Sequence, residues 1–353
     1  SWRAILLSQP SDGMAKRKSW ASRVILLAAL CGLLALLGYL QTQRFARQAL
    51  ELNRETAQFT VDKGDGLNKI LPKMRAAGIT QGADWQWKVL AMQMGMASKI
   101  HVGDYKILRS DTPRMLLHKL AIGDTARIKF TIIEGWSFRQ LMQQIKGIPE
   151  VSDDVSALST DALMQMLGKT GVHPEGRFLP DTYFVPLSGK KSQIFIEAAN
   201  AMDKALAQAW AKRQPGLPIK SPEELLILAS IVEKETGVAS ERAQIAGVFV
   251  RRLQKGMRLE TDPTVIYGMG LAYDGNIRKN DLRTVTPYNT YRIKGLPPTP
   301  IAMPGKAALQ AAANPAPGES LFFVANGKRA HVFSSTYAEH RKAVEAYQMK
   351  RDP

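Results

Sequence analysis

An uncharged apolar run near the N-terminus constrains the fold of this chain more than any other feature. From Val24 to Leu40 the sequence holds only apolar residues, two glycines, a cysteine and a tyrosine. This run is at the short end of the length that a helix needs to cross a bilayer. Trp20 and Tyr39 are placed for the two membrane–water interfaces. The run therefore predicts a transmembrane helix over residues 24–40.

The flanks of this run indicate its direction in the membrane. Lys16–Lys18 lie just before it, and basic residues favour the cytoplasmic side, so we expect residues 1–23 to be a cytoplasmic N-terminal tail. A cleaved signal peptide is the alternative, but polar Gln41–Arg44 follows where small residues would mark a cleavage site. Met14 is typical of a natural start, so residues 1–13 are left out of the expected fold.

Composition narrows the classes of partner. The formal net charge of +17 suits nucleic acid, an anionic membrane or an acidic polymer. The sequence shows no basic-aromatic, zinc-finger or basic-zipper pattern, so no nucleic acid is expected as a partner. The single cysteine, Cys31, lies inside the apolar run, which rules out a disulfide within the chain. The five histidines show no metal-ligand spacing, and we expect neither a metal nor a cofactor.

The segment after the apolar run predicts a small subdomain. A helical continuation or a stalk is expected from residue 45 to about residue 58. Then follow a strand at 59–61, helices at 67–77 and 85–94, and a strand at 102–108. This strand–helix–helix–strand order over residues 57–125 resembles a LysM-type module, a small fold that binds N-acetylglucosamine polymers. A purely structural subdomain is the alternative.

The remainder, residues 126–350, predicts a mixed domain in which helices and short strands alternate. The expected class is therefore α+β: an N-terminal transmembrane helix, a LysM-like βααβ subdomain and a mixed α+β catalytic domain. The expected elements are a strand at 127–134, helices at 138–146, 192–213, 221–236, 240–254 and 336–350, an acidic stretch that then becomes helical at 152–168, a hairpin at 320–333, a loop or strand edge at 175–183, and loops at 261–268, 287–291 and 295–300.

The helix expected at 221–236 is apolar nearly all round and ends in carboxylates. Ser221 is placed as its N-cap, and Glu224 completes a capping box. An apolar helix of this kind is buried. Glu235 shares a stripe with Ile231 and Leu228, four and seven residues earlier, whereas Glu233 lies on a smaller and less apolar surface. Helix geometry therefore favours Glu235 as the more desolvated acid.

A carboxylate at such a helix end has two interpretations. Burying it costs several kcal/mol unless it is paired or protonated. Glu235 is thus either a partnered structural acid or a proton donor with a raised pKa. The plainer alternative is that both glutamates are surface acids beside Lys234, in a fraying last turn.

Ordered blocks across residues 57–345 resemble the endolytic murein transglycosylases, the MltG or YceG-like family. The blocks are Glu175-Gly176-x-Phe178-x-Pro180-Asp181-Thr182-Tyr183, Ala229–Thr236, Arg258-Leu259-x-Thr261-Asp262-Pro263-Thr264-Val265-Ile266-Tyr267, Pro287–Tyr291, Gly295–Pro298, Ala302-x-Pro304-Gly305, His331-x-Phe333 and His340. Thr299 stands where the family pattern has a glycine, a departure within a loop.

The resemblance implies an enzyme of the bacterial inner membrane with a periplasmic catalytic domain. Its substrate would be the glycan strands of nascent peptidoglycan, cut at MurNAc-β-1,4-GlcNAc bonds to leave 1,6-anhydro-MurNAc ends and so to terminate strand elongation. Peptidoglycan synthases (penicillin-binding proteins) are the implied protein partners. The family's catalytic acid falls on Glu235, in agreement with the helix geometry.

The resemblance also supplies candidate substrate-binding residues, which we expect to shape a cleft: Glu175, Tyr183, Thr261, Asp262, Tyr288, Asn289 and Tyr291. Asp262 and Glu175 are the plausible second carboxylates that a glycoside hydrolase would require. Asp262 is assigned instead to turn chemistry before Pro263. Two alternatives stay open: a hydrolase of the same polymer, and a non-catalytic glycan-binding scaffold for cell-wall synthases.

Overall fold

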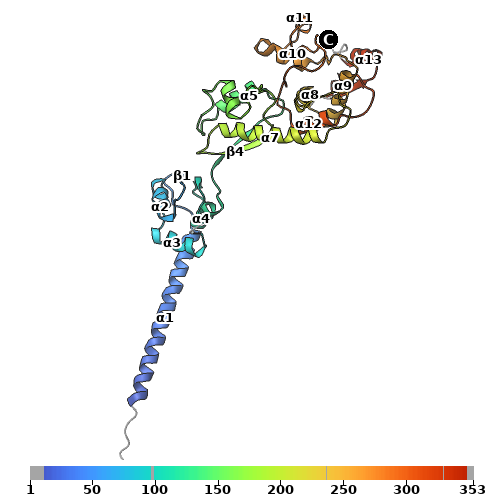
Figure 1. Cartoon of the computed structure of the whole chain (residues 1–353). Coiled ribbons are helices and arrows are strands. Elements are labelled where there is room, and N and C mark those ends of the chain that lie inside the picture. Colours follow the sequence, from blue (N-terminus) through green and yellow to red (C-terminus); the bar gives the residue numbers. More distant parts are fainter. Residues whose placement is uncertain (1–11, 97–98, 236, 329, 348–353) are drawn as a thin grey trace, which may run out of the picture. The chain divides into compact units, whose positions relative to one another are not determined.

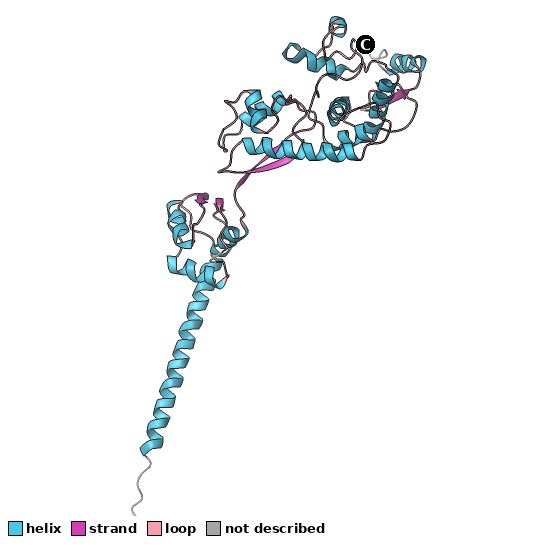
Figure 2. Ribbon diagram, in the orientation of Figure 1, coloured by secondary structure: helices cyan, strands magenta, loops and turns pink. Residues whose placement is uncertain are grey.

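The computed structural model of this chain describes residues 12–96, 99–235, 237–328 and 330–347 (Figure 1). The chain divides into two compact units, Ser1–Ala126 and Arg127–Pro353, and each is described by itself. Helices dominate the described part, and its strands pair in two-stranded antiparallel sheets (Figure 2). The class is therefore mixed α+β, as predicted.

Helix α1 (Asp12–Arg47) contains the predicted transmembrane segment without a break. Among the described residues, its part Arg23–Arg47 is the one helix long and apolar enough to cross a membrane, by length and composition, with a mean hydropathy of 2.3. The helical alternative predicted to about residue 58 is wrong beyond Arg47. The reason is that Leu50 and Leu52 are buried in the core of the first unit, which draws the chain away from the helix axis.

The rest of the first unit follows the predicted strand–helix–helix–strand order. Strands β1 and β2 pair antiparallel, with Phe59 opposite Tyr105. A further helix was not predicted, although Thr112 caps it by accepting from the Met115 N–H, 3.2 Å away, and a glycine ends it. The binding of glycan by this unit stays a prediction. Its elements are β1 (Thr56–Val61), α2 (Leu67–Ala76), α3 (Asp84–Gln93), β2 (Gly103–Leu108) and α4 (Pro113–Ile122).

Helices around one apolar helix form the main core of the second unit. Helix α8 (Pro222–Glu235) is packed by α7 (Ser192–Ala211), α9 (Arg242–Gln254) and α12 (Lys306–Ala313). Helices α7, α8 and α9 follow the predicted helices within a few residues, whereas α12 was not predicted. Within 152–168, predicted as an acidic stretch that then becomes helical, α6 (Thr160–Met166) forms in the second half, as expected.

The loop predicted at 261–268 is also wrong, because α10 (Asp262–Met269) occupies it. Pro263 lies in the first turn, where its missing N–H and fixed φ favour a helix. Thr264 and Val265 are buried on the inner face of α10. Burial of this short apolar face therefore outweighs the loop-like composition of the segment.

The remaining elements complete the second unit. Strand β3 is shorter than the strand predicted at 127–134, and it pairs with β4 (Thr182–Pro186). Strand β4 begins within the segment 175–183, which was predicted as a loop or strand edge. The predicted hairpin is confirmed, with Ala325 opposite His331. The elements are β3 (Arg127–Thr131), α5 (Phe138–Lys146), β4 (Thr182–Pro186), the short helices η1 (Ala239–Glu241), η2 (Gly270–Ala272) and α11 (Lys279–Arg283), β5 (Phe322–Ala325), β6 (His331–Ser334) and α13 (Tyr337–Tyr347). The predicted end of the last helix, residues 348–350, lies outside the described residues.

Candidate active site

Helix α8 begins with the predicted cap and is buried along most of its length. The Ser221 hydroxyl accepts from the Glu224 N–H at 3.2 Å, which confirms the N-cap. The predicted capping box is wrong in its second half, since the Glu224 carboxylate accepts from Lys220 N at 2.6 Å and not from Ser221. Every residue from Leu225 to Val232 is buried. The rigid core thus fixes where the last turn, with its two glutamates, comes out.

Glu235, the last residue of α8, is a partly buried carboxyl group with a neutral partner. Its Oε1 accepts a hydrogen bond from the Thr261 hydroxyl. Burial raises the pKa of Glu235 to about 7, and the charge of Asp262 acts in the same direction. The Thr261 bond and His331 lower this pKa but do not cancel the effect of burial. Glu235 therefore keeps a proton close to neutral pH.

Glu233, two residues earlier, is also buried but has a different set of partners. Its side chain is 5 % exposed, accepts from the Gly305 N–H at 2.9 Å, and lies 3.5 Å from the Arg242 guanidinium. Burial raises its pKa, while Gly305 and Arg242 oppose that rise. The prediction that Glu235 is the more desolvated acid, made from the helix stripes, therefore left out the partners of each carboxyl group. Both are desolvated, and it is the cation beside Glu233 that makes it a partnered structural acid.

A cluster of buried threonines holds Thr261 against Glu235. The Thr290 hydroxyl accepts from the Thr261 N–H at 3.0 Å and lies 2.8 Å from the Thr264 hydroxyl. The Thr264 hydroxyl also donates to the Thr261 carbonyl at 2.8 Å. These three side chains are 2 % exposed or less. Because the Thr264 and Thr290 hydroxyls bond to the backbone of Thr261, they fix the position from which the Thr261 hydroxyl reaches Glu235.

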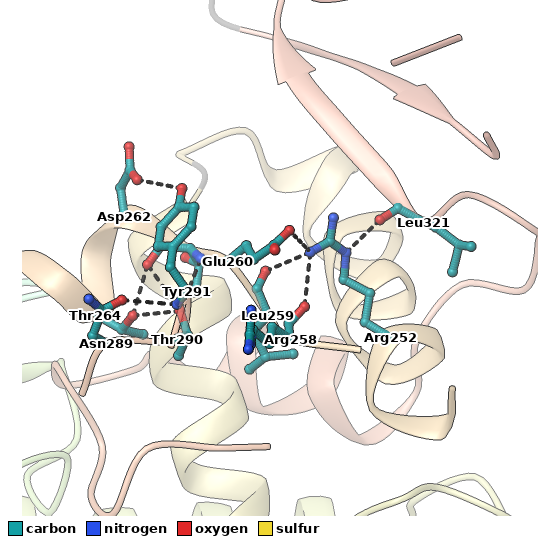
Figure 3. Close-up of polar contacts among 11 residues, drawn as sticks. Arg252, Arg258, Leu259, Glu260, Asp262, Thr264, Asn289, Thr290, Tyr291 and Leu321 are labelled. Carbon is teal, nitrogen blue, oxygen red and sulfur yellow. Dashed lines mark hydrogen bonds and ion pairs between the residues drawn. The ribbon is translucent and has the colours of Figure 1, made fainter. Parts of the chain in front are cut away.

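Asp262 and Tyr291 form a polar pair beside this cluster (Figure 3). The Tyr291 hydroxyl donates to the Asp262 carboxylate at 2.7 Å. The turn chemistry expected of Asp262 is not what its carboxylate does, because the residue opens α10 and the side chain points to Tyr291. Burial raises the pKa of Tyr291, and the bond to Asp262 adds to the rise. The Tyr291 hydroxyl therefore stays protonated, and able to donate a hydrogen bond, throughout the neutral pH range.

Arg252 of α9 fixes the segment that leads into Thr261. Its guanidinium donates to the carbonyl groups of Arg258 (3.0 Å), Leu259 (3.1 Å) and Leu321 (2.6 Å), and to the Glu260 carboxylate (3.1 Å) (Figure 3). Glu260 has a φ of 52°, a left-handed conformation that non-glycine residues seldom adopt. The buried guanidinium holds this strained residue in place, and through it the position of Thr261.

A cavity of about 960 Å³ opens next to these residues. Glu175 lines it, accepts from the Phe138 N–H at 2.9 Å, and is 3 % exposed. Burial raises the pKa of Glu175 to about 7. Glu235 is not among the lining residues, but Lys234, its neighbour in α8, is. Pro263, next to Asp262, lines the cavity as well. The acid at the end of α8 therefore lies beside the cavity and not within it.

Aromatic and basic side chains make up much of the remaining cavity wall. Tyr267 of α10 and Tyr288 have ring centroids 5.0 Å apart, and the Tyr288 hydroxyl lies 2.8 Å from that of Thr299. Arg139 and Lys234 bring positive charge to the same wall. A wall of this composition suits a sugar polymer that carries anionic substituents, since tyrosine combines a flat apolar face with a polar tip.

Two of the predicted substrate-binding residues lie in the interior. The Asn289 amide donates to the Asp281 (3.1 Å) and Thr284 (2.6 Å) carbonyl groups and accepts from the Tyr291 N–H at 3.0 Å. The Tyr183 hydroxyl donates to the Leu179 carbonyl at 2.6 Å. Either residue would have to leave these bonds to contact a ligand. Asn289 therefore holds the loop that carries Tyr288 and Tyr291, whereas Tyr183 belongs to the apolar cluster around β3 and β4.

Sequence reasoning missed several residues of the site. Thr290 lies in the block Pro287–Tyr291 that resembles the family, yet no pattern in the neighbouring sequence indicates that its hydroxyl reaches Thr261. Nothing in the sequence indicated a role for Arg252 or Arg139, since neither lies in a block that resembles the family. Glu241, whose carboxylate binds the His331 ring at 2.7 Å, was missed in the same way. The described residues contain no group of three or more His, Cys, Asp or Glu placed to hold a metal.

Comparison with known proteins places these features in a family. The YceG-like family matches residues 59–346. The endolytic murein transglycosylase of Bacillus subtilis (strain 168) is 30 % identical over 268 residues, which span 71 % of this chain and 74 % of that protein. The protein of the same name from Streptococcus pneumoniae serotype 2 is 32 % identical over 173 residues, 47 % of this chain and 30 % of that one. The crystal structure of a YceG-like protein from Listeria monocytogenes has a TM-score of 0.51 and 27 % identity, covering 82 % of this chain and 98 % of that one.

Proposed function

This chain belongs to the YceG-like family, and from that premise we propose that it is an endolytic lytic transglycosylase of peptidoglycan. The relatives named endolytic murein transglycosylase support the substrate and the reaction class. The observation that carries the proposal is Glu235. It is a carboxyl group whose pKa burial raises to about 7, held by a hydroxyl and placed beside a large cavity.

The reaction needs one group that first gives and then takes a proton. Protonated Glu235 donates its proton to the oxygen of the MurNAc-β-1,4-GlcNAc bond as the bond to C1 breaks. The C6 hydroxyl of the same MurNAc then closes on C1, and the Glu235 carboxylate takes the hydroxyl proton. Glu235 ends protonated, no water is consumed, and one strand ends in 1,6-anhydro-MurNAc. Thr261 stabilises the carboxylate in the interval between the two transfers.

The other acids near the site do not supply the ionised nucleophile that a retaining hydrolase requires, which favours this mechanism over hydrolysis. Glu175 is desolvated and holds its proton near neutral pH, so it is a poor nucleophile and a suitable hydrogen-bond donor to a sugar. Asp262 is occupied by the Tyr291 hydroxyl. We propose that Glu175, Asp262, Tyr288 and Tyr291 bind and orient the strand, and that Thr261 acts on it through Glu235. Asn289 supports that wall from the interior, whereas Tyr183 packs in the apolar cluster around β3 and β4.

The surroundings of the enzyme follow from its first unit. We propose that α1 anchors the chain once in the bacterial inner membrane, with residues 1–23 in the cytoplasm and residues 126–350 in the periplasm. The apolar segment and the basic residues before it support this direction. The unit at 57–125 is proposed to be LysM-like. Because a cut in a nascent strand ends its elongation, peptidoglycan synthases of the penicillin-binding type are the proposed partners.

Glu235→Gln tests the catalytic role, with Glu233→Gln as the matched control on the same helix. The amide cannot donate a proton to the glycosidic oxygen, so we expect strand cleavage to fall by at least about 10²-fold while the protein still folds. Gln at position 233 can still accept from Gly305, so its effect is milder. The measurement is mass spectrometry of the products released from sacculi, with circular dichroism as the check on folding.

The product masses also separate the alternatives. The anhydro product is lighter than a reducing end by one water, so reducing ends would identify a hydrolase. Cleavage near the wild-type rate by Glu235→Gln would exclude the proposed acid. A chain in which neither wild type nor variant cleaves, but both bind sacculi, would be the non-catalytic scaffold.

A further inference from the structure

The helix that crosses the membrane continues directly into the core of the first unit. Every residue from Arg23 to Gln41 is exposed, whereas Thr42 is 3 % exposed and Phe45 is 4 % exposed. The buried part of α1 thus begins within two residues of Leu40, where the apolar run ends. Two residues of helix correspond to a rise of about 3 Å. The chain has no spacer that would let the unit stand away from the bilayer.

The joint between α1 and the unit is fixed by side-chain contacts. The rings of Phe45 and Trp87 meet edge to face with centroids 5.2 Å apart. The Arg114 guanidinium of α4 donates to the Gln43 side chain at 3.1 Å. Ala46 is fully buried. Because α1 remains helical through these contacts, the unit cannot swing freely about the end of the anchor.

One face of the unit is turned toward the apolar run. Helix α3 lies across the end of α1, at the edge of the unit from which α1 leaves (Figure 1). Trp87 and Leu90 on one side of α3 are fully buried in the core. The opposite stripe, Trp85, Lys88 and Met92, is spaced three and four residues apart and is exposed. This stripe therefore points away from the core, on a helix that lies at the edge of the unit from which α1 leaves (Figure 1).

The chemistry of this stripe matches the membrane–water interface. Trp85 is 53 % exposed and Met92 is 74 % exposed. Met115, next to Arg114 at the joint, is 47 % exposed. Tryptophan is enriched at the headgroup level of membranes, and lysine places its stem on apolar surface while its charge reaches anionic headgroups.

The depth of the stripe agrees with that chemistry. The headgroup layer is about 5–7 Å thick on each side of the hydrocarbon core. Thr42, the first buried residue after the apolar run, lies two residues beyond Leu40, about 3 Å along the helix from the end of that run. The base of the unit is therefore at headgroup level.

We propose that the face formed by Trp85, Lys88, Met92 and Met115 rests on the lipid surface of the bilayer that α1 crosses. The first unit is then a membrane-surface module with a fixed height as well as a continuation of the anchor. This inference rests on the proposed membrane anchor. Its occupant is lipid, because the exposed apolar segment of α1 requires lipid around it and ends at the edge of this face.

The test uses the full chain in vesicles of phosphatidylcholine and phosphatidylglycerol. A Cys31→Ser background carries an environment-sensitive fluorophore on one new cysteine at a time: Met92→Cys for the proposed face, Lys106→Cys for strand β2 at the opposite edge of the unit, and Leu33→Cys for the middle of the anchor. Lipids with a nitroxide at the headgroup or deep in the acyl chain quench a fluorophore that touches that depth. We expect the label at position 92 to be quenched by headgroup nitroxide about twofold or more above the label at 106.

The same measurements separate the failure of this inference from that of the anchor. If position 33 is quenched by deep nitroxide while 92 and 106 behave alike, the anchor stands and the proposed lipid contact is overturned. If position 33 is not quenched, the anchor is overturned and the contact with it. A label at 92 that lipid nitroxide does not quench, but that a nitroxide attached at position 92 of a second copy of the chain does quench, would identify that copy as the occupant and would also overturn the proposal.

Discussion

Two glutamates on one helix turn show how neighbours decide the use of a buried carboxyl group. Glu233 and Glu235 are both desolvated, and burial raises the pKa of each. Arg242 lies beside the first as a fixed positive charge, whereas the second has the Thr261 hydroxyl as its partner. An arginine stabilises the charged form far more than a hydroxyl does. Glu235 is therefore the one that can release and recover a proton near neutral pH.

Holding a proton at Glu235 has a consequence for stability that depends on pH. The folded-state pKa is about 7, above the value of about 4.3 for a free glutamate. The native state therefore binds this proton more tightly than the unfolded state. The stabilisation is complete below about pH 4.3 and is lost as pH rises through about 7. Asp262 strengthens this effect and His331 weakens it.

Glu235→Gln removes this titration, so the variant should gain stability relative to wild type as pH rises. We expect little difference near pH 5 and a free energy of unfolding higher by up to about 3 kcal/mol near pH 8, at about 1.4 kcal/mol per pKa unit. Urea unfolding at both pH values measures it. Glu197→Gln, at an exposed position on α7, is the control and should show no such trend. A difference between variant and wild type that is the same at both pH values would mean that Glu235 is already ionised.

Thr261→Val tests how the hydroxyl adjusts the acid. The Thr261 hydroxyl bonds to the Glu235 carboxylate and lowers its pKa, so an apolar side chain of the same shape should raise that pKa further. We expect the alkaline limb of the pH–rate profile for strand cleavage to move to higher pH, even if the maximal rate falls. Thr284→Val, at an exposed threonine, should leave the limb in place. A limb that moves to lower pH would contradict the assignment of Glu235 as the acid.

The segment between α9 and α10 shows that the position of a site residue also depends on a side chain from another secondary-structure element. Arg252 binds three backbone carbonyl groups and the Glu260 carboxylate, which are the contacts that bring Thr261 to the end of α8. Lysine offers a compact charge without the planar fork, so it cannot satisfy these acceptors together. Stability and catalysis therefore depend on one side chain that lies outside the cavity wall.

Arg252→Lys should lower both properties. We expect a loss of about 1–3 kcal/mol in the free energy of unfolding, because buried acceptors lose their partners. We also expect a fall in kcat with a smaller change in KM, since the strand-binding wall around Glu175 is left intact. Chemical unfolding and cleavage kinetics measure the two. Arg258→Gln is the control, because Arg258 is exposed and takes part through its backbone carbonyl. Equal losses in both variants would refute the role of the guanidinium.

The sequence was sufficient for elements whose own pattern determines them. Helix α8 was predicted from its apolar run and Ser221 cap, and the β5–β6 hairpin from Asn326-Gly327. It was insufficient for α10, whose loop-like composition is overruled by burial of Thr264 and Val265. The residue types of the site were also predictable, as Glu235 and Thr261 show.

The pairing of site residues was not predictable. Thr261 meets Thr290, and Asp262 meets Tyr291, across stretches of 29 residues, and no local period encodes such contacts. The burial of Glu233 beside Arg242 was not predictable for the same reason, since no local sequence pattern encodes that contact. The charges that distinguish one glutamate from the other come from different helices, and only the packed fold brings them together.

For the chain as a whole, the net charge of +17 bears on how the proposed enzyme meets its substrate. Peptidoglycan strands carry carboxylates on their peptide stems, and the cavity wall presents Arg139 and Lys234. A field of one sign raises the local concentration of an oppositely charged polymer and speeds the encounter. The positive charge of the chain then raises its affinity for the strand, whereas the proton of Glu235 serves to break the glycosidic bond.

Binding to sacculi should therefore weaken with salt, and the inactive Glu235→Gln variant in detergent allows binding to be measured without cleavage. Raising the ionic strength from about 0.1 M to 1 M shortens the screening length from about 10 Å to about 3 Å. We expect the affinity measured by co-sedimentation to fall roughly tenfold, as several charge pairs become screened. An uncharged N-acetylglucosamine oligomer is the control ligand, and its affinity should hardly change. If sacculi behave like the uncharged oligomer, recognition depends on the aromatic and hydroxyl groups of the wall, and the basic surface serves another partner.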